Sequence, residues 1–189
     1  MFHKGHLFII SGPSGVGKST ILRAILEKRP QLQYSVSYTT RPRRRNEQDG
    51  ADYHFINELA FRKKIDANEF AEWAEVHGHL YGTSGRYIEE ALNKGQDVLL
   101  DIDVEGAKSL SSRYPEEYRI FIAPPSVEEL ERRMKGRDTD APDVVGRRLK
   151  NAQAEMAQAH LYDRVVVNDD LAQTVSELEE IIEEVRSRN

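Results

Sequence analysis

The segment GPSGVGKS at residues 12–19 has the residue types and the spacing to hold a phosphorylated ligand. It matches the pattern G-x-x-x-x-G-K-[ST], in which glycines allow successive backbone N–H groups to face one anion. Lys18 is expected to reach the outer phosphates of a nucleoside triphosphate, and the Ser19 hydroxyl to bind Mg²⁺. A chance glycine-rich turn is the alternative. The predicted phosphate-binding residues are Gly12, Pro13, Ser14, Gly15, Val16, Gly17, Lys18, Ser19 and Thr20.

Four arginines within five residues indicate a second anion site. Arg41, Arg43, Arg44 and Arg45 repel one another unless an anion or solvent screens them. Guanidinium groups bind phosphate oxygens in a fork geometry, and Tyr53 can add a hydroxyl. A solvated basic surface and an RNA contact are the alternatives. Two phosphate sites in one chain would mean that a phosphoryl group is moved from one ligand to another.

Glu72 has the chemistry to recognise a guanine base. A carboxylate only accepts hydrogen bonds, and the edge of guanine offers two adjacent N–H donors. A hydroxyl such as that of Ser37 can donate to guanine O6, whereas adenine would turn a lone pair toward the carboxylate. Tyr81 and Thr83 follow Glu72 in the same segment. The alternative is that Glu72 is a solvated surface residue.

The elements that must position these residues alternate between short apolar runs and helical patterns. This alternation predicts a parallel sheet flanked by helices. The expected strands are 7–10, 98–100, 120–122 and 165–167. The expected helices are 18–28, 124–137, 139–160 and 171–188. In the second helix Ser126 is the expected N-cap and Glu129 its capping-box partner, and Pro142 should lie near the start of the third. Residues 34–81 break the alternation and predict an inserted lobe.

Composition excludes several classes of protein. The chain has 189 residues and a net charge of -5, which argues against a dedicated nucleic-acid binder. It contains no cysteine, so a disulfide framework and a thiolate zinc site are impossible. No apolar stretch is long enough to serve as a signal peptide or to span a membrane. We therefore expect a cytoplasmic protein of one domain, with nucleotides rather than nucleic acid or membrane as partners.

A phosphate loop alone does not distinguish a GTPase from a kinase. The segment NKGQD at residues 93–97 superficially resembles the guanine-reading N-K-x-D motif of GTPases. Its aspartate lies one position too late, and a Lys-Gly pair is typical of the end of a helix. We interpret this segment as structural.

Taken together, six segments resemble the guanylate kinase family, in the family's order and over almost the whole chain. They are GPSGVGKST, SVSYTTRPRRRNEQDGADYHF, EFAEWAEVHGHLYGTS, LLDIDVEGAKSL, FIAPPSVEELERR and VVVNDD. The resemblance implies an α/β P-loop kinase fold, with a central parallel sheet, an inserted mixed α/β lobe that binds GMP and a helical lid. The implied parts are a core at 1–36, 89–133 and 156–189, a GMP-binding lobe at about 37–88 and a lid at about 134–155.

The resemblance also assigns roles to residues. It implies transfer of the γ-phosphoryl group of ATP to GMP, and probable use of dGMP, within purine nucleotide metabolism and with Mg²⁺ as cofactor. The implied GMP-binding residues are Ser37, Arg41, Arg44, Tyr53, Glu72, Tyr81, Thr83 and Asp103. Arg133 and Asn168 are implied on the ATP side, Asn168 near the adenine. The implied catalytic residues are Lys18, Arg41, Arg44, Arg137 and Arg148. Asp101 is expected to hold Mg²⁺ through a water, with a buried structural acid as the alternative.

The chain departs from the family pattern at two places. Asn46 stands where a glycine is common, next to the additional charge of Arg45, and Asp138 follows Arg137 where a glycine is common. Neither departure removes a residue that would carry chemistry. Two other functions stay open at this point. One is an inactive module that binds phosphopeptides through the acceptor lobe, and the other is a kinase of another small phosphate such as a ribose bisphosphate.

Overall fold

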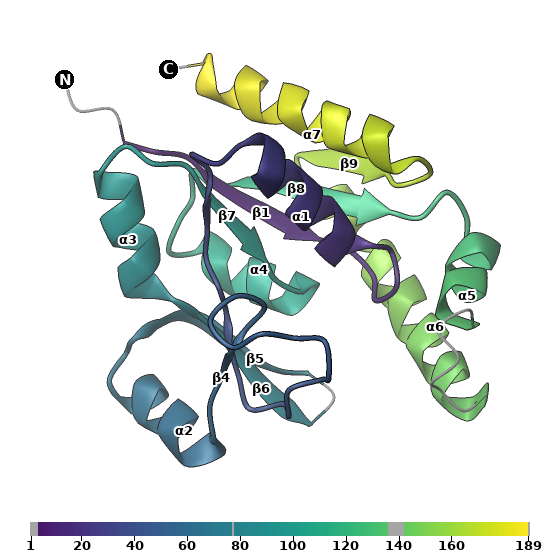
Figure 1. Cartoon of the computed structure of the whole chain (residues 1–189), viewed down its shortest axis with the longest axis horizontal. Helices are drawn as coiled ribbons and strands as arrows, with labels where there is room; N and C mark the ends of the chain where they lie inside the picture. Colours follow the sequence, from purple (N-terminus) through teal and green to yellow (C-terminus); the bar gives the residue numbers. More distant parts are fainter. Residues whose placement is uncertain (1–3, 77, 136–141, 189) are drawn as a thin grey trace. The chain divides into compact units, whose positions relative to one another are not determined.

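The computed structural model describes residues 4–76, 78–135 and 142–188, and it describes side chains for all of these except residues 142–145. The chain divides into two compact units, residues 1–8 with 31–117 and residues 9–30 with 118–189. The strands are β1 (Leu7–Ser11), β2 (Gln33–Tyr34), β3 (Tyr38–Thr39), β4 (His54–Phe55), β5 (Phe70–Val76), β6 (His79–Ser84), β7 (Val98–Asp101), β8 (Tyr118–Ala123) and β9 (Arg164–Val167). The helices are α1 (Lys18–Lys28), α2 (Glu58–Asp66), α3 (Gly85–Asn93), α4 (Val104–Ser111), α5 (Val127–Lys135), α6 (Pro142–Met156), the 3-10 turn η1 (Ala159–Leu161) and α7 (Leu171–Arg186) (Figure 1).

The larger sheet has the strand order β2-β7-β1-β8-β9. In the first unit β2 pairs in parallel with β7, with Gln33 opposite Val98, and in the second unit β8 pairs in parallel with β9, with Ile120 opposite Arg164. Parallel strands are usually covered on both faces, which explains why β1, β7 and β8 read as unbroken apolar runs. The predicted α/β fold with a parallel sheet is confirmed, and so are the four strands predicted within it.

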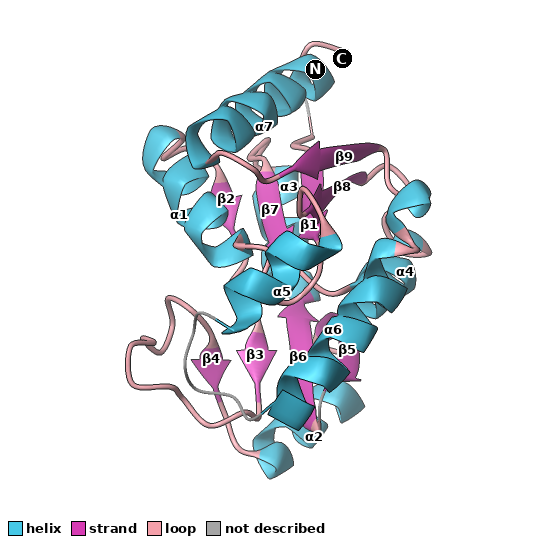
Figure 2. Cartoon of the chain, turned by 90° about the vertical axis from the view of Figure 1, so that its right-hand side faces the viewer, coloured by secondary structure: helices cyan, strands magenta, loops and turns pink. Residues whose placement is uncertain are grey.

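The first unit also contains a four-stranded sheet in the order β4-β3-β6-β5, which Figure 2 shows with its strands side by side. The long pair β5 and β6 is antiparallel, and its register places Glu72 opposite Thr83. Phe61 of α2, Phe70 and Leu80 form a buried cluster against this sheet. The strands of this sheet lie between residues 38 and 84, largely within the stretch where the sequence predicted a break in the alternation. Along β5 the less exposed residues 70, 72, 74 and 76 alternate with more exposed ones, as in a strand with one covered face.

In the second unit α1 and α7 lie side by side (Figure 1). Each helix buries one stripe of aliphatic side chains at helical spacing, as the sequence predicted. The buried residues are Ile21, Leu22 and Ile25 of α1 and Val175, Leu178, Ile181, Ile182 and Val185 of α7. Ion pairs such as Arg29 Nη1 to Glu183 Oε1, at 2.6 Å, lie at the edge of this contact.

The start of α1 differs from the starts of other helices. In α2, α3, α4 and α7 a side chain of the N-cap residue accepts a backbone N–H of the first turn. Helix α1 begins after Gly17, which has no side chain to do this. Its first N–H groups therefore keep their capacity to bind an anion.

Three smaller predictions have clear outcomes. Helix α3 ends at Asn93 and Gly95 follows with a φ of 73°, so the NKGQD segment is the helix-ending turn that the sequence predicted. Helix α6 is described from Pro142 to Met156, so it ends before the predicted end at residue 160, where the 3-10 turn η1 follows instead; the predicted residues 139–141 lie outside the described residues. Among the residues described here, no helix combines the length and apolarity needed to cross a membrane. The division into core, lobe and lid stays a prediction.

Candidate functional site

The phosphate loop lies between β1 and α1 in the second unit, and its backbone conformation explains why glycine occurs at two of its positions. Gly15 and Gly17 have φ values of 88° and 103°, in the left-handed region that favours glycine. A Cβ at position 17 would also lie 2.8 Å from Nδ2 of Asn168. The loop conformation thus depends on glycine for backbone freedom and, at position 17, for space.

Lys18 lies at the start of α1, as predicted. Its Nζ donates to the carbonyl of Gly12 at 2.7 Å, so the ammonium group folds back over the loop. The next two residues, Ser19 and Thr20, are exposed on the first turn of α1. A cation, a hydroxyl and uncapped N–H groups therefore gather at one helix terminus, which is the arrangement that binds phosphate.

Two of the predicted donor-side arginines contact the loop. Arg148 of α6 donates from Nη2 to the Ser14 hydroxyl at 2.8 Å, and Arg133 of α5 donates from Nη1 to the Val16 carbonyl at 3.4 Å. Arg137 and Asp138 lie outside the described residues. A cavity of about 430 Å³ opens beside the loop. It is lined by Gly15, Val16, Gly17, Thr20, Arg132, Arg133, Asn168, Asp169 and Leu171.

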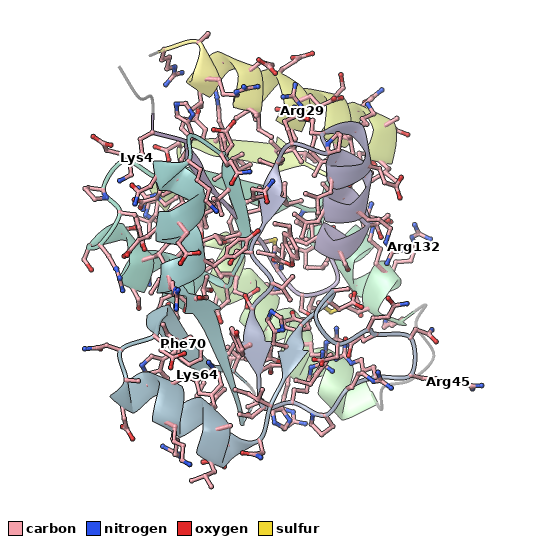
Figure 3. The ribbon with its side chains drawn as sticks, turned by 60° about the vertical axis from the view of Figure 1, so that its left-hand side comes forward. Lys4, Arg29, Arg45, Lys64, Phe70 and Arg132 are labelled. Carbon is pink, nitrogen blue, oxygen red and sulfur yellow. The ribbon has the colours of Figure 1, made fainter. Side chains whose placement is uncertain are left out.

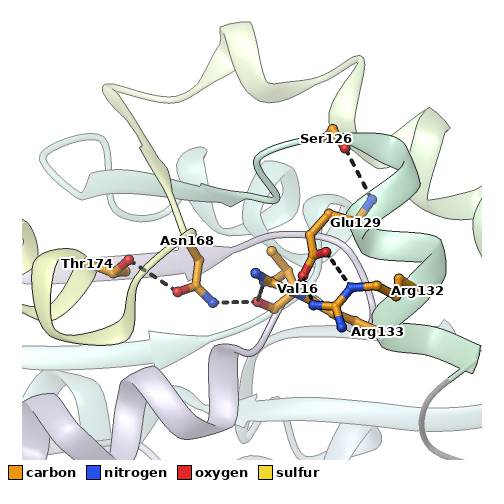
Figure 4. Close-up of polar contacts among 7 residues, drawn as sticks. All are labelled: Val16, Ser126, Glu129, Arg132, Arg133, Asn168 and Thr174. Atoms are coloured by element: carbon orange, nitrogen blue, oxygen red, sulfur yellow. Dashed lines mark hydrogen bonds and ion pairs between the residues drawn. The ribbon is translucent and has the colours of Figure 1, made fainter.

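Helix α5 begins as the sequence predicted, but one detail differs. The Ser126 hydroxyl accepts the backbone N–H of Glu129 at 3.1 Å, which makes Ser126 the N-cap. The carboxylate of Glu129 was expected to complete a capping box. Instead it accepts from Arg132 Nε at 2.7 Å and from Arg133 Nε at 2.7 Å, and these bonds lower the pKa of Glu129 to about 2 (Figure 4). Each guanidinium group carries a positive charge, whereas the backbone amide of a capping box is neutral, so the carboxylate is attracted more strongly to the two arginines.

In the first unit the arginine-rich loop is organised by a residue that the sequence did not single out. The carboxylate of Glu47 accepts from Arg41 Nη1 at 3.0 Å and from Nη2 at 2.7 Å. It also accepts the backbone N–H of Arg44 at 2.8 Å, while the Glu47 N–H donates to the Arg44 carbonyl at 3.1 Å. The carboxylate of Glu47 thus binds both terminal nitrogens of Arg41 in the fork geometry that guanidinium groups also use for phosphate oxygens.

The surroundings of Arg41 are partly aromatic. Its guanidinium carbon lies 5.4 Å from the ring centre of Tyr53 and 5.7 Å from that of Phe55. Burial alone would lower the pKa of Arg41, but hydrogen bonds with Glu47 and Tyr81 outweigh it and raise the pKa. The rings of Tyr53 and Tyr81 meet edge to face at 5.8 Å. Three of the implied GMP-binding residues, Arg41, Tyr53 and Tyr81, are therefore neighbours.

The other arginines of the loop are more exposed. Arg43, Arg44 and Arg45 are all solvent-accessible, and Figure 3 shows Arg45 projecting away from the ribbon. Arg44 is joined to the Arg41 cluster through its backbone. Arg43 and Arg45 fit the solvated surface that was the alternative for this run of charge.

Glu72 is buried, which removes the alternative of a solvated surface carboxylate. It is 7% exposed, and the Thr83 hydroxyl on the neighbouring strand donates to its Oε1 at 2.5 Å. Burial raises the pKa of Glu72 to about 7, with the negative charge of Asp103 adding to it and the Thr83 hydrogen bond opposing it. A buried carboxylate with one hydroxyl partner retains accepting capacity for a ligand.

Helix α4 packs against β5, the strand that carries Glu72. Asp103 is its N-cap, and its Oδ1 accepts the N–H of Gly106 at 2.7 Å. A Cβ at position 106 would lie 2.9 Å from Glu72 Oε2 and 3.3 Å from Asp103 Oδ1. Gly106 therefore leaves room for two carboxylates to approach one helix terminus. The sequence reasoning missed this residue, because one glycine within a helix carries no signal of the partner that fills its space.

Two further predicted residues are placed as follows. Ser37 is buried between β2 and β3, and its carbonyl accepts the N–H of His54 at 2.9 Å. Asp101 is the last residue of β7. The pKa of Tyr34 and that of Tyr53 are both raised, first by burial and next by the negative charge of Asp101.

Comparisons with known proteins agree with one another. The family model described as guanylate kinase matches residues 4–185. The chain is 48% identical to "Guanylate kinase" from Dechloromonas aromatica over 178 residues, which is 94% of this chain and 88% of that protein. It is 48% identical to "Guanylate kinase" from Geobacter metallireducens over 188 residues, covering 100% and 93%. The crystal structure of guanylate kinase from Anaplasma phagocytophilum matches with a TM-score of 0.81 at 33% identity, over 97% of this chain and 87% of that one.

Proposed function

Because the chain belongs to the guanylate kinase family, we propose that it is an enzyme that transfers the γ-phosphoryl group of ATP to GMP, giving ADP and GDP. The reaction is reversible, because a phosphoanhydride bond is both broken and formed. dGMP presents the same base and phosphate as GMP and is expected to be a second acceptor. A cytoplasmic location and a role in purine nucleotide metabolism follow from these substrates and belong to the same proposal.

The observation that supports guanine as the acceptor base is the burial of Glu72. A carboxylate kept out of water is costly unless a partner compensates for the lost hydration. The N1–H and N2–H groups of guanine are such partners, and the Thr83 hydroxyl holds the other side of the carboxylate. Adenine offers a lone pair at the same edge, so it would meet the charge of Glu72 without a donor.

The chemistry needs no general base. The attacking atom is a phosphate oxygen of GMP, which is already anionic at neutral pH. Catalysis then depends on alignment of the reacting groups and on cations that neutralise charge on the transferring phosphoryl group. The residues proposed for this role are Lys18, Arg41, Arg44, Arg137 and Arg148. Tyr53 and Tyr81 complete the cradle of the acceptor phosphate.

Mg²⁺ is the metal ion that this reaction class requires, and the chain offers ligands of the right kind. The Ser19 hydroxyl and, through a water, the Asp101 carboxylate are hard oxygen donors, as Mg²⁺ prefers. Mg²⁺ usually keeps several waters and binds through few protein groups together with phosphates, so this small donor set suffices. When bound, the ion would neutralise charge on the donor phosphates.

The direct test is an assay of ADP release from ATP with GMP, dGMP, AMP, CMP, UMP and ribose phosphates offered one at a time. GMP and dGMP should be phosphorylated much faster than the others. A preference for a ribose phosphate would show a different small-molecule kinase. If calorimetry detected no binding of Mg²⁺·ATP, the chain would be a binding module instead.

The substitution Glu72→Gln tests recognition of the guanine base by itself. Glu72→Gln replaces one accepting oxygen with a donating NH₂ group, which would face the donors of guanine. We expect the KM for GMP to rise roughly a hundredfold, because two charge-assisted hydrogen bonds are weakened or lost. The rate with AMP should not fall in parallel. An unchanged KM for GMP would exclude Glu72 from the acceptor site.

A further inference from the structure

The carbonyl oxygen of Val16, in the middle of the phosphate loop, accepts two side-chain hydrogen bonds. Asn168 donates from Nδ2 at 2.7 Å and Arg133 from Nη1 at 3.4 Å (Figure 4). This carbonyl belongs to the peptide unit that carries the N–H of Gly17. In a planar trans peptide the C=O and N–H bonds point in opposite directions. A carbonyl held toward Asn168 and Arg133 therefore fixes the Gly17 N–H to point away from them.

Asn168 is well placed to hold this peptide. It is 8% exposed and follows directly on β9, and its own N–H donates to the Ala123 carbonyl of β8 at 2.8 Å. The Thr174 hydroxyl lies 3.2 Å from its Oδ1. The carbonyl of Val16 can only accept, so the amide must turn its NH₂ group toward the loop. Both ends of the Asn168 amide are thus occupied by protein groups.

The packing around Asn168 is equally tight. Any Cβ at Gly17 would come within 2.8 Å of Nδ2. The amide therefore lies directly against the loop backbone, and a shift of Asn168 would be felt at the Val16–Gly17 peptide. The weaker donor, Arg133, is itself held by Glu129, whose Oε1 accepts from Arg133 Nε at 2.7 Å. Of the two contacts on the Val16 carbonyl, the one from Asn168 is the shorter and the more buried.

We propose that Asn168 is a positioning residue of the phosphate loop. It acts on the donor phosphates through the Val16–Gly17 peptide, rather than by recognising the adenine base. This inference rests on the proposed function, because it takes ATP as the ligand of the loop. It predicts that loss of the Asn168 amide weakens the binding of every ligand whose phosphates lie on the loop at residues 12–20, whatever base that ligand carries.

The experiment uses the full chain with Asn168→Ala and Asn168→Leu, which remove the donor without adding charge. Leucine also keeps most of the side-chain shape. Asn93→Ala is the matched control, since Asn93 is exposed at the end of α3. Calorimetry measures the dissociation constants of Mg²⁺·ADP, of Mg²⁺·tripolyphosphate, which has no base, and of GMP. Thermal unfolding reports the stability of each variant.

Affinity for ADP and for tripolyphosphate should fall by the same factor, roughly tenfold or more, because a buried acceptor loses its donor. Affinity for GMP should stay at the parent value, and Asn93→Ala should match the parent throughout. A loss confined to ADP would overturn the inference and assign Asn168 to the base. An equal loss for all three ligands with a lower Tm would also overturn it, as would no loss at all. If the parent bound neither ADP nor tripolyphosphate, the proposed function itself would fall.

Discussion

The two nucleotide sites proposed above are built on different principles: the donor region is the phosphate loop at residues 12–20, and the acceptor region comprises the residues around Arg41 and Glu72. The donor region uses consecutive residues whose backbone N–H groups follow a glycine-rich turn into an uncapped helix. The acceptor region uses charged side chains from separate segments, and these already have partners: Arg41 has Glu47, and Glu72 has Thr83. The donor region therefore presents backbone N–H dipoles that are already oriented for an anion. In the acceptor region Arg41 and Glu72 must share or exchange their present partners when a ligand binds.

The difference has an energetic consequence. Backbone dipoles in a fixed loop need no reorganisation when an anion arrives. A buried or half-buried ion pair must instead share or exchange a partner, and the free energy of binding is reduced by what the old pair contributed. We therefore expect each substitution to change the affinity for one nucleotide only. Substitutions in the donor region should affect ATP, and those in the acceptor region should affect GMP.

The largest expected effect comes from Lys18. Lys18→Ala removes the cation at the start of α1 and should lower kcat roughly a hundred- to a thousandfold, the usual range for losing one group that stabilises transition-state charge. The affinity for GMP, measured by calorimetry, should be unchanged. Lys63→Ala, an exposed lysine of α2, is the control. A kcat within tenfold of the parent would contradict the role of Lys18.

Glu47 tests whether a carboxylate prepares the acceptor cradle. Glu47→Gln should raise the KM for GMP roughly tenfold and leave the KM for ATP unchanged, because Arg41 and the Arg44 backbone lose a charged partner. Glu58→Gln is a matched control, since it breaks the exposed pair of Glu58 with Arg62 on α2. Exposed pairs of this kind contribute little. A lower KM for GMP in Glu47→Gln would show that Glu47 only competes with the phosphate.

The pH dependence of GMP binding tests the buried carboxylate. In the proposed function guanine binds the ionised form of Glu72, whose pKa is raised to about 7 by burial. The dissociation constant of GMP should therefore fall about tenfold between pH 6 and pH 8, since the protonated fraction drops from most of the protein to little of it. Glu72→Gln should lose this component and retain only the part that comes from ionisation of the phosphate of GMP.

Glu72 also makes the free energy of unfolding depend on pH, with the opposite sign. A rise in pH should strengthen GMP binding but reduce the contribution of Glu72 to stability. An unfolded glutamate titrates near 4.5, below the raised value of Glu72 in the folded chain. Between these two values the folded state binds more protons, so the contribution of Glu72 to the free energy of unfolding decreases as pH rises through this window. Glu72→Gln should flatten that decrease in denaturant titrations without ligand. An equally steep decrease in both proteins would contradict the assignment.

The smallest expected effect comes from Gly106. A methyl group there would press on Glu72 Oε2, so Gly106→Ala should raise the KM for GMP about threefold even though alanine favours a helix by about 1 kcal/mol. Lys108→Ala, at an exposed position of α4, is the control. The KM for GMP is the decisive measurement, because we expect Tm to change little. An unaltered KM would mean that the two carboxylates can move aside without loss.

The two regions also differ in how far the sequence predicted them. The phosphate loop and its strand and helix could be read directly, because the nine residues of the loop motif are consecutive in the sequence. The pairing of Arg41 with Glu47 was missed, although both lie in one loop, because a turn that folds a carboxylate back on a guanidinium has no fixed spacing. The approach of Gly106 to Glu72 joins a helix to a strand about thirty residues away. Such contacts depend on tertiary packing rather than on local pattern.

The double anchoring of Val16 has a consequence for how this protein tolerates change. The group that receives both hydrogen bonds is a main-chain atom, so no replacement of the Val16 side chain can delete it. Scanning mutagenesis along the loop would therefore overlook the contact. Only substitutions at the distant residues 133 and 168 would remove the hydrogen-bond donors. Chemical synthesis could reach the atom itself, by exchanging one amide bond of the loop for a thioamide, whose sulfur is a poorer acceptor.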